Sequence, residues 1–454
     1  MDSGGGRREC GGRGKRRRRT ARVPAGRRST PEEMAQAVEW LAVDAPDYLT
    51  AERLNVTGGL DRELAGMNQR RDCRITRIDT YVVGAKWCNW VFAHVFTDDG
   101  IQGVGEGTCE FQPKAVEAAI QQLAHRVVLG QSAFHIERLW QDMFRNEFAR
   151  GGPILMSAIG AIEMAMWDIV GKALGRPVYD LLGGSVRERI PAYANAWYGA
   201  GAALPEIGRA AAAVAAKGYR GLKFDPFADA GRDPDAKRIR SAVEMAACVR
   251  EAVGPDLDVL IDCHGRFSPG SAIAIARELE PCKLYWFEEP CDPENVQALA
   301  KVGRSIATRL ATGERCYTKY HLQALLASNE VGVLQPDPIH VGGILEAKKI
   351  AAIADAAYTP VSFHNPFGPV ATAACLQLDA CTTNFIMQES FCEYSPAWRF
   401  ELLEHPPRPR EGGYDLPTLP GLGVGEFVPE GARAHPFDVD AFLPMWSDAW
   451  RFKL

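Results

Sequence analysis

Apolar residues recur in two different patterns along the chain. Over residues 74–106, extended apolar runs are separated by turn signals such as Asp-Asp-Gly at 98–100, which predicts an antiparallel meander. Helical periodicity follows over residues 113–129, 134–147 and 154–174. These elements predict a small α+β domain, which we place at residues 73–186.

From residue 187 to 392, a short β-rich run and a helical run alternate repeatedly. The predicted strands are residues 190–194, 220–224, 257–261, 284–287, 310–312, 333–335, 360–363 and 384–387. Eight such units over about 200 residues predict a parallel (β/α)8 TIM barrel, since a doubly wound sheet more often stops at five or six strands. Residues 393–454 are rich in Pro and Gly, which predicts an extended return segment.

The first 72 residues differ in composition from the rest of the chain. Residues 1–30 hold eleven Lys and Arg against two acidic residues, although the whole chain of 454 residues has a formal charge of -5. The acidic remainder argues against a nucleic-acid-binding body, and the basic start is typical of a disordered arm. A helical pattern at 31–42 interrupts this arm, and a translation start at Met67 would remove nearly all of it. An organellar transit peptide is a weaker alternative, because acidic residues follow the basic stretch.

The cysteines and the hydropathy pattern predict a cytoplasmic protein. Twelve cysteines are scattered without a C-x-x-C pair, which indicates free thiols in a reducing compartment. We find no apolar run of about 18 residues that would predict a membrane span. The arginines at 16–19 are not followed by the apolar core of a signal peptide. The Gly-x-Gly-x-Gly run at 103–107 lacks the strand, turn and helix of a nucleotide loop.

Polar residues follow each predicted barrel strand from the second onward. They are Lys223 and Asp225, Asp262 and His264, Glu288, Glu314, Asp337, His364 and Glu389. From Asp225 the successive intervals are 37, 26, 26, 23, 27 and 25 residues, each close to one β/α period. Because functional groups of such barrels stand at the carboxyl ends of the strands, we expect these side chains to ring one mouth.

Three of these residues form a candidate metal site. Asp262, Glu288 and Glu314 come from consecutive strands and bring only oxygen donors, which suit Mg²⁺ better than Zn²⁺. A single acid of this kind is usually a surface residue or an ion-pair partner. Three in register on successive strands favour the metal.

Two histidines are candidates for proton transfer. Asp337 and His364 end adjacent strands, so the carboxylate could orient the imidazole as a general base. Asp337 also lies between two prolines and could simply form a turn. His264 could be a second proton-transfer group or a helix-capping histidine, and Trp87 could cover a pocket or pack at a domain interface.

Several motifs together resemble one family. They include the I-x-x-I-x-x-A-x-W-D helix at 159–168, Leu-Leu-Gly-Gly at 181–184, Trp-Phe-Glu-Glu-Pro at 286–290, Gly-Glu-Arg at 313–315, Gln-Pro-Asp at 335–337, and Asp-Cys-His-Gly-Arg at 262–266. Residues 74–427 resemble the mandelate racemase subgroup of the enolase superfamily, and within it the sugar-acid dehydratases of the galactonate dehydratase type. The resemblance implies a modified barrel, an α+β capping domain at 73–186, a return of residues 393–454 to that domain, and a homo-oligomer.

The resemblance also implies roles for the candidate residues. Asp262, Glu288 and Glu314 would hold Mg²⁺, which stabilises charge developing on a substrate carboxylate. His364 would be the base at C2 with Asp337 as its partner, and His264 the acid that protonates the leaving 3-hydroxyl. Glu389 would donate a hydrogen bond to the substrate carboxylate. Lys223 completes the catalytic set, and we expect Arg266, Asp225 and Trp87 to contact the substrate.

One residue departs from the racemase pattern, in which two lysines bracket one residue and the second is a base. Here Asp225 occupies the second position, which disfavours racemisation. Asp225 could tether Lys223, contact a sugar hydroxyl, or touch the water shell of the metal.

The predicted function is a Mg²⁺-dependent dehydratase in carbohydrate catabolism that converts a sugar acid to a 2-keto-3-deoxy acid through an enediolate. Galactonate is the first candidate, with gluconate and pentonates open. An epimerase, racemase or cycloisomerase of a related acid is the alternative. A non-catalytic barrel with a nucleic-acid-binding arm is more remote.

Overall fold

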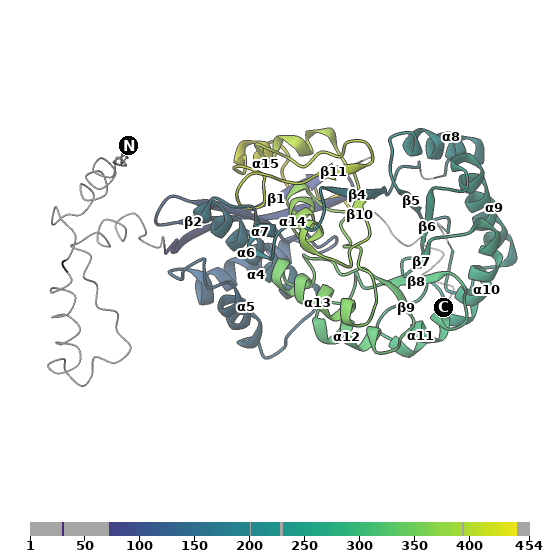
Figure 1. Cartoon of the computed structure of the whole chain (residues 1–454), viewed down its shortest axis with the longest axis horizontal. Helices are drawn as coiled ribbons and strands as arrows, with labels where there is room; N and C mark the ends of the chain where they lie inside the picture. Colours follow the sequence, from purple (N-terminus) through teal and green to yellow (C-terminus); the bar gives the residue numbers. More distant parts are fainter. Residues whose placement is uncertain (1–29, 31–71, 200, 228–229, 393–394, 443–454) are drawn as a thin grey trace, which may run out of the picture. The chain divides into compact units, whose positions relative to one another are not determined.

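The computed structural model describes residues 30, 72–199, 201–227, 230–392 and 395–442 (Figure 1). The described residues from 72 to 442 belong to one unit. The predicted arm, including its helical pattern at 31–42, lies outside the described residues except for Thr30 and Asp72.

The α+β domain begins with a three-stranded antiparallel sheet in the order β1-β2-β3. Its strands are β1 (Ile75–Ala85), β2 (Cys88–Thr97) and β3 (Gln102–Glu106). Helices α4 (Pro113–Leu123), α5 (Ile136–Arg145) and α6 (Pro153–Leu174) follow, and α4 runs into a π-helical turn, Ala124–Val128. A Cβ on Gly105 would lie 1.8 Å from the carbonyl oxygen of Ala161, so glycine lets β3 and α6 approach closely.

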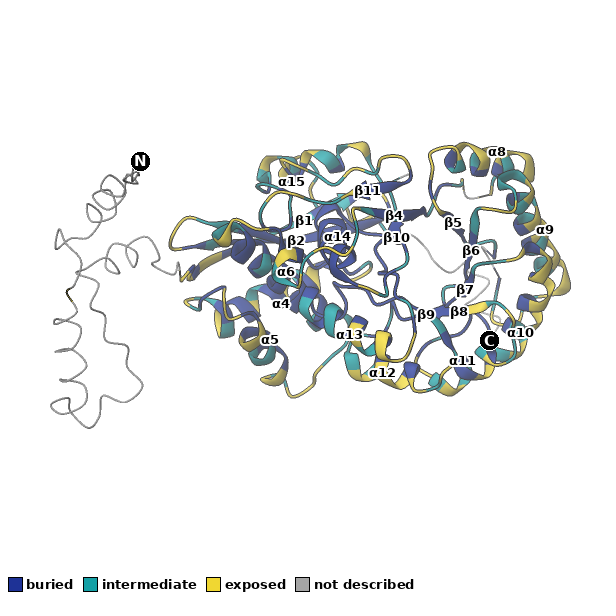
Figure 2. Ribbon diagram, viewed as in Figure 1, coloured by how far each residue is buried: buried dark blue, intermediate teal, exposed yellow. Residues whose placement is uncertain are grey.

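The barrel strands pair in parallel in the order β10-β4-β5-β6-β7-β8-β9. They are β4 (Arg189–Ala194), β5 (Gly221–Phe224), β6 (Asp258–Asp262), β7 (Trp286–Glu288), β8 (Arg309–Thr312), β9 (Val331–Leu334) and β10 (Gln388–Ser390). The helices around them are α8 (Leu204–Ala215), α9 (Ala236–Val253), α10 (Pro269–Glu278), α11 (Val296–Gly303), α12 (Lys319–Leu326), α13 (Ile344–Ala356) and α14 (Pro369–Cys381). Figure 2 shows the strands buried and the outer helices exposed on one side. The predicted fold class, a barrel preceded by an α+β domain, is confirmed.

The seventh predicted strand, residues 360–363, is reduced to a single paired residue. Val361 bridges to Leu334 on one side and to Phe385 on the other, which links β9 to the segment before β10. Pro360 has no N–H to give to a ladder, and its carbonyl oxygen accepts from the backbone N–H of Leu334. The eighth strand, predicted at residues 384–387, begins four residues later, as β10 (Gln388–Ser390).

The chain after the barrel runs back along it. Strand β11 (Gly413–Asp415) pairs antiparallel with β4, outside the ring. Helix α15 (Pro429–Ala434) follows, and Pro436 then bridges to Val83 of β1. The side chain of Asn89 donates to the backbone oxygen of Asp438 at 2.9 Å. Residues 413–438 therefore contact both the barrel and the first sheet.

Buried carboxylates fasten the α+β domain to the barrel. Glu106 accepts from the backbone N–H groups of Gly368 and Ala371, at the start of α14. Glu163 accepts from Ile344 and Leu345, at the start of α13. Helix N-termini present free N–H groups and favour negative charge, so these contacts fix the domain over the barrel mouth.

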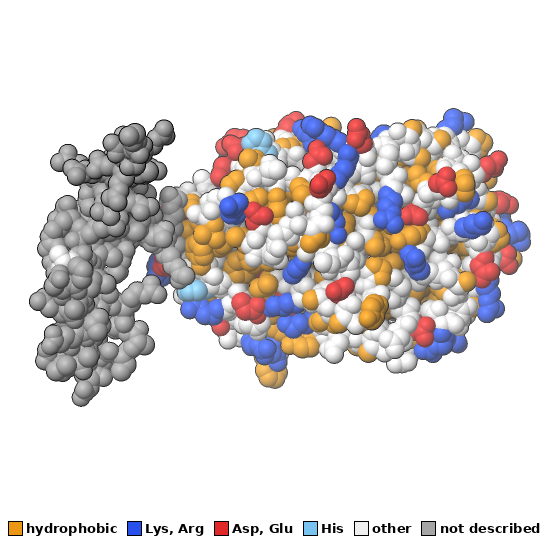
Figure 3. Space-filling model, in the orientation of Figure 1, with side chains coloured by type: hydrophobic (Ala, Val, Ile, Leu, Met, Phe, Trp, Pro, Cys, Tyr) orange, Lys and Arg blue, Asp and Glu red, His pale blue; other side chains and the backbone are white. Residues whose placement is uncertain are grey.

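Helix α6 also changes one expectation about membranes. The helix has 22 residues, and an 18-residue window within it has a mean hydropathy of 1.5. By length and composition it could cross a bilayer. However, 83% of that window is buried inside the protein, as in the core helix of a globular domain. On the face shown in Figure 3, basic and acidic side chains are intermixed over the barrel helices.

Candidate active site

A cavity of about 390 Å³ lies between the capping domain and the barrel mouth. Six of the predicted site residues line it: Trp87, Lys223, Asp262, His264, Glu314 and His364. Its other walls come from the capping domain and from barrel loops: Cys109, Glu110, Phe111, Gln112, Pro153, Asn195, Ala196, Tyr198, Arg315, Tyr317, His340, Pro366 and Phe391. The sequence therefore located the barrel side of the cavity, and the capping side comes largely from residues that it did not single out.

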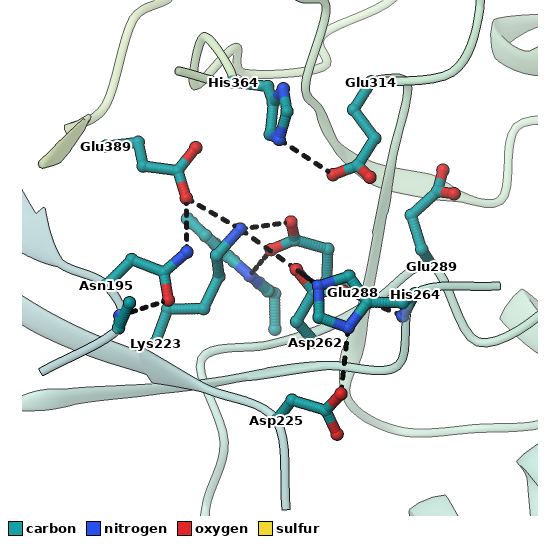
Figure 4. A network of polar contacts seen from close by, with 12 residues as sticks. Asn195, Lys223, Asp225, Asp262, His264, Glu288, Glu289, Glu314, His364 and Glu389 are labelled. Carbon is teal, nitrogen blue, oxygen red and sulfur yellow. Dashed lines mark hydrogen bonds and ion pairs between the residues drawn. The ribbon is translucent and has the colours of Figure 1, made fainter. Parts of the chain in front are cut away.

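The three predicted metal ligands converge. Asp262 and Glu288 are paired in register at the ends of β6 and β7, and Glu314 follows β8. Each offers an oxygen, and these oxygens lie within 4.8 Å of one another. The Nζ atom of Lys223 lies against the same group, 2.6 Å from Glu288 and 3.1 Å from Asp262 (Figure 4).

The electrostatics of this cluster fit a divalent cation. Burial raises the pKa of Glu288, and the neighbouring charge of Asp262 raises it further. Burial likewise raises the pKa of Glu314, whose Oε2 atom is buried and accepts no hydrogen bond from any described residue. Burial also opposes ionisation of Asp262, yet the charges of His264 and Lys223 lower its pKa. A cation with oxygen preference would compensate this crowded negative charge and satisfy the Glu314 oxygen.

His364 is held by Asp337. Its Nδ1 atom lies 2.8 Å from Oδ2 of Asp337, so that Nε2 faces Glu314 at 3.4 Å. Burial works against charge on His364, but Glu314 and Asp337 raise its pKa well above the ordinary value. The other oxygen of Asp337, Oδ1, accepts from the backbone N–H of Ile339. Asp337 therefore both forms a turn and orients the imidazole of His364.

His264 has a carboxylate partner of its own, Asp225. The Nδ1 atom of His264 lies 2.9 Å from Oδ2 of Asp225, and its Nε2 atom lies 3.6 Å from Asp262. Arg266 donates to both oxygens of Asp225, at 3.0 and 2.8 Å. His264 takes a φ of 52°, which side-chain-bearing residues rarely adopt, and this turn directs its ring back over the end of β6.

Asp225 and Arg266 therefore lie behind His264 rather than in the cavity wall. Of the roles considered for Asp225, a tether to Lys223 does not match these contacts, because Lys223 instead pairs with Asp262, Glu288 and Glu389. The short distance from Asp225 to Arg266 places a buried guanidinium in bidentate contact with a partly buried carboxylate.

Glu389 is arranged as a hydrogen-bond acceptor. Its Oε1 atom lies 2.9 Å from Nζ of Lys223 and accepts from Asn195, and its Oε2 atom accepts from the backbone N–H of Asn365. Burial opposes ionisation, but Lys223 and His364 lower the pKa of Glu389. Both oxygens of Glu389 thus face donors of the protein, and the hydrogen bond to a substrate carboxylate that the resemblance implies stays a prediction.

Trp87 lies at the cavity wall among other aromatic rings. It stacks on Phe367, with ring centroids 6.1 Å apart, and its ring lies 5.7 Å from that of Phe391. The side chain is 8% exposed. Both interpretations of Trp87, a pocket cover and a packing residue, are therefore compatible with its position.

Both halves of the chain match known family descriptions. Residues 75–183 match the mandelate racemase / muconate lactonizing enzyme N-terminal domain, and residues 206–425 match the enolase C-terminal domain-like family. A D-galactonate dehydratase from Xanthomonas oryzae pv. oryzae is 42% identical over 386 residues, which cover 82% of this chain and 97% of that protein. The chain belongs to the mandelate racemase / muconate lactonizing enzyme family of the enolase superfamily.

Further relatives agree with this assignment. A D-gluconate dehydratase from Thermoproteus tenax is 35% identical over 407 residues, 88% of this chain and 81% of that protein. The crystal structure of a mandelate racemase/muconate lactonizing enzyme from Sulfitobacter sp. superposes with a TM-score of 0.77 at 31% identity, and covers 81% of this chain and 96% of that one. The resemblance inferred from the motifs is thus confirmed at the level of family and fold.

Sequence reasoning missed several cavity residues of this mandelate racemase family member. Asn195 directly follows the first barrel strand, so the strand-end rule would have found it had it been applied there. The capping residues Cys109 and Glu110 follow β3, for which no barrel period gives a signal. His340 lies in a turn after β9 and reaches the cavity only because Asp337 folds that turn.

Proposed function

We propose that this family member is a Mg²⁺-dependent sugar-acid dehydratase that converts an aldonate to a 2-keto-3-deoxy acid. The observation that carries the proposal is that two histidines, each held by its own carboxylate, line one cavity with a cluster of three acids. Relatives named D-galactonate dehydratase and D-gluconate dehydratase support the substrate class. Dehydration needs one group to take a proton and another to give one, and this arrangement supplies both.

In the proposed reaction, different residues hold the metal, remove the C2 proton and protonate the leaving hydroxyl. Asp262, Glu288 and Glu314 would hold Mg²⁺, whose charge favours loss of the proton α to the substrate carboxylate. His364 takes that C2 proton at Nε2, because Asp337 occupies its Nδ1 atom.

The second half of the reaction falls to His264. Asp225 holds Nδ1 of His264, so Nε2 gives a proton to the 3-hydroxyl as the C3–O bond breaks and water leaves. The resulting enol then tautomerises to the 2-keto acid. Lys223 neutralises Glu288 and Glu389 beside the substrate carboxylate.

The substrate class can be tested with a panel of sugar acids. Purified protein with Mg²⁺ is incubated with hexonates, pentonates and aldarates, and semicarbazide detects 2-keto products. We expect turnover of D-galactonate, D-gluconate or a close stereoisomer, and none by Glu288→Gln. If no aldonate or aldarate is turned over, the proposal is wrong.

The two histidine roles can be separated by isotope exchange. His264→Asn should block dehydration but still exchange the C2 hydrogen in D2O, since C2 deprotonation needs only His364 and the metal site. His364→Asn should lose both, each by roughly 10²- to 10⁴-fold. If His264→Asn instead lost C2 hydrogen exchange and His364→Asn kept it, the base and acid roles would be swapped. If the parent enzyme exchanged the C2 hydrogen but formed no keto acid, it would be an epimerase.

A further inference from the structure

A second group of metal-ligating side chains faces the same cavity. Cys109, Glu110 and His340 each offer a ligand atom, and these atoms lie within 4.8 Å of one another. All three residues line the cavity, and the side chains of Cys109 and His340 are each only 5% exposed. They share no residue with the acidic cluster of Asp262, Glu288 and Glu314.

The two clusters differ in donor chemistry. The acidic cluster offers oxygen alone, whereas this one combines a thiol, an imidazole and a carboxylate. Sulfur and nitrogen donors select borderline ions such as Zn²⁺ over Mg²⁺. We propose that Cys109, Glu110 and His340 form a second divalent-metal site, specific for Zn²⁺-like ions, whose open coordination position faces the substrate cavity.

The surroundings of His340 suit a metal ligand. One ring nitrogen, Nε2, lies 3.3 Å from the carbonyl oxygen of Thr108, and the other, Nδ1, lies 3.8 Å from Oδ2 of Asp337. The rings of Tyr317 and Phe367 contact the imidazole edge-on, with centroids 6.2 and 5.5 Å away. The orientation of the ring is therefore largely fixed before an ion arrives.

The geometry needs only a small closure. Tetrahedral zinc with bonds of about 2.0 to 2.3 Å places its ligand atoms about 3.3 to 3.8 Å apart, so each side chain has at most about 1.5 Å to move. Cys109 and Glu110 follow β3 of the capping domain, and His340 follows β9 of the barrel. A bound ion would thus cross-link the two domains across the mouth.

A cysteine binds a divalent ion as its thiolate, so Cys109 would release its proton when the ion binds. An ion in the cavity wall would also compete with the sugar acid.

The site can be tested spectroscopically, without turnover. Co²⁺ is titrated into the full chain in excess Mg²⁺, which occupies the acidic cluster, and thiolate-to-cobalt absorption in the near ultraviolet is recorded. We expect a band in the parent that one equivalent of Zn²⁺ abolishes.

Matched variants identify the ligands. Cys109→Ser should lose the band, and Glu110→Gln should keep it with at least tenfold weaker binding. Cys316→Ser, which removes another buried cysteine near the mouth, should change neither. The proposal falls if the parent shows no band at pH 8.5 or if Cys109→Ser retains it.

Inhibition of turnover by Zn²⁺ rests on the proposed function. Zn²⁺ should inhibit turnover competitively with the sugar acid in excess Mg²⁺, and Cys109→Ser should resist it. A cobalt band without inhibition would mean that the ion does not face the substrate. The cobalt band is measured without turnover. A failure of the proposed metal site (no band) can therefore be distinguished from a failure of the proposed function (no sugar acid turned over).

Discussion

Replacing Glu314 with Gln tests the proposed metal site most directly. The Oε2 atom of Glu314 is buried and lies 3.4 Å from Nε2 of His364, and the ion pairs of Lys223 are with Asp262, Glu288 and Glu389. Glu314 therefore brings a charge that Lys223 does not neutralise by contact. Glu314→Gln keeps the shape of the side chain and removes that charge.

The expected magnitude follows from ligand loss. Removing a residue that only supports a ligand typically weakens metal binding about 10- to 100-fold, so loss of a ligand itself should cost at least about 100-fold. At a Mg²⁺ concentration of about 100 times the parent Kd, binding stabilises the parent by about 2.7 kcal/mol. The same concentration would only equal the Kd of the variant and would stabilise it by about 0.4 kcal/mol.

The assay is urea unfolding with and without Mg²⁺, alongside calorimetric titration of the ion. Glu110→Gln is the control, because it removes one negative charge from the same cavity without touching the acidic cluster. Without Mg²⁺, Glu314→Gln should be at least as stable as the parent, since it relieves crowded negative charge. An equal Mg²⁺-dependent gain in variant and parent would show that Glu314 is not a ligand.

Two further predictions concern buried charges. Asp225→Asn should reduce turnover by at least about 10²-fold, because His264 loses its partner, and should destabilise the fold by about 3 to 5 kcal/mol, because Arg266 keeps a buried charge. Combining it with Arg266→Met should restore stability in urea but not turnover, and joint recovery would contradict an orienting role. Asp379 is fully buried, with no hydrogen bond from a described residue to either oxygen, and burial raises its pKa well above the ordinary value. The protonated Asp379 contributes fully to stability below the pKa of the unfolded state, and this contribution is lost as pH rises. The free energy of unfolding of Asp379→Asn should therefore equal that of the parent near pH 4 and exceed it by about 1 to 3 kcal/mol near pH 8. An equal difference at both pH values would refute this.

The barrel side of the site could be predicted because the topology repeats. Each β/α unit returns the chain to the same mouth, so equal spacing in sequence becomes neighbourhood in space. Asp262, Glu288 and Glu314 were found in this way, and they do converge. The rule fails where a residue reaches the cavity from outside the repeat, as Cys109 and Glu110 do from the capping domain.

The seventh segment shows a different limit of sequence reasoning. Its apolar run around Val361 has the composition of a strand, but only one residue pairs. His364 is nonetheless placed at the barrel mouth by two backbone hydrogen bonds. The N–H of Ser362 donates to the carbonyl of Leu334, and the N–H of His364 donates to the carbonyl of Pro336. A strand end can therefore be correctly placed even where the strand itself is largely absent.

Asp225 explains how one barrel position can change the chemistry of its neighbour. The residue lies just after β5, and its side chain reaches sideways to His264 after β6. A neutral lysine here could accept a proton, whereas both oxygens of Asp225 are already engaged by His264 and Arg266, so the carboxylate holds and polarises the imidazole of the next strand. Arg266, two residues beyond His264, fixes that carboxylate from behind. Under the proposed function, His264 held by Asp225 would be the oriented acid that departure of a hydroxyl requires.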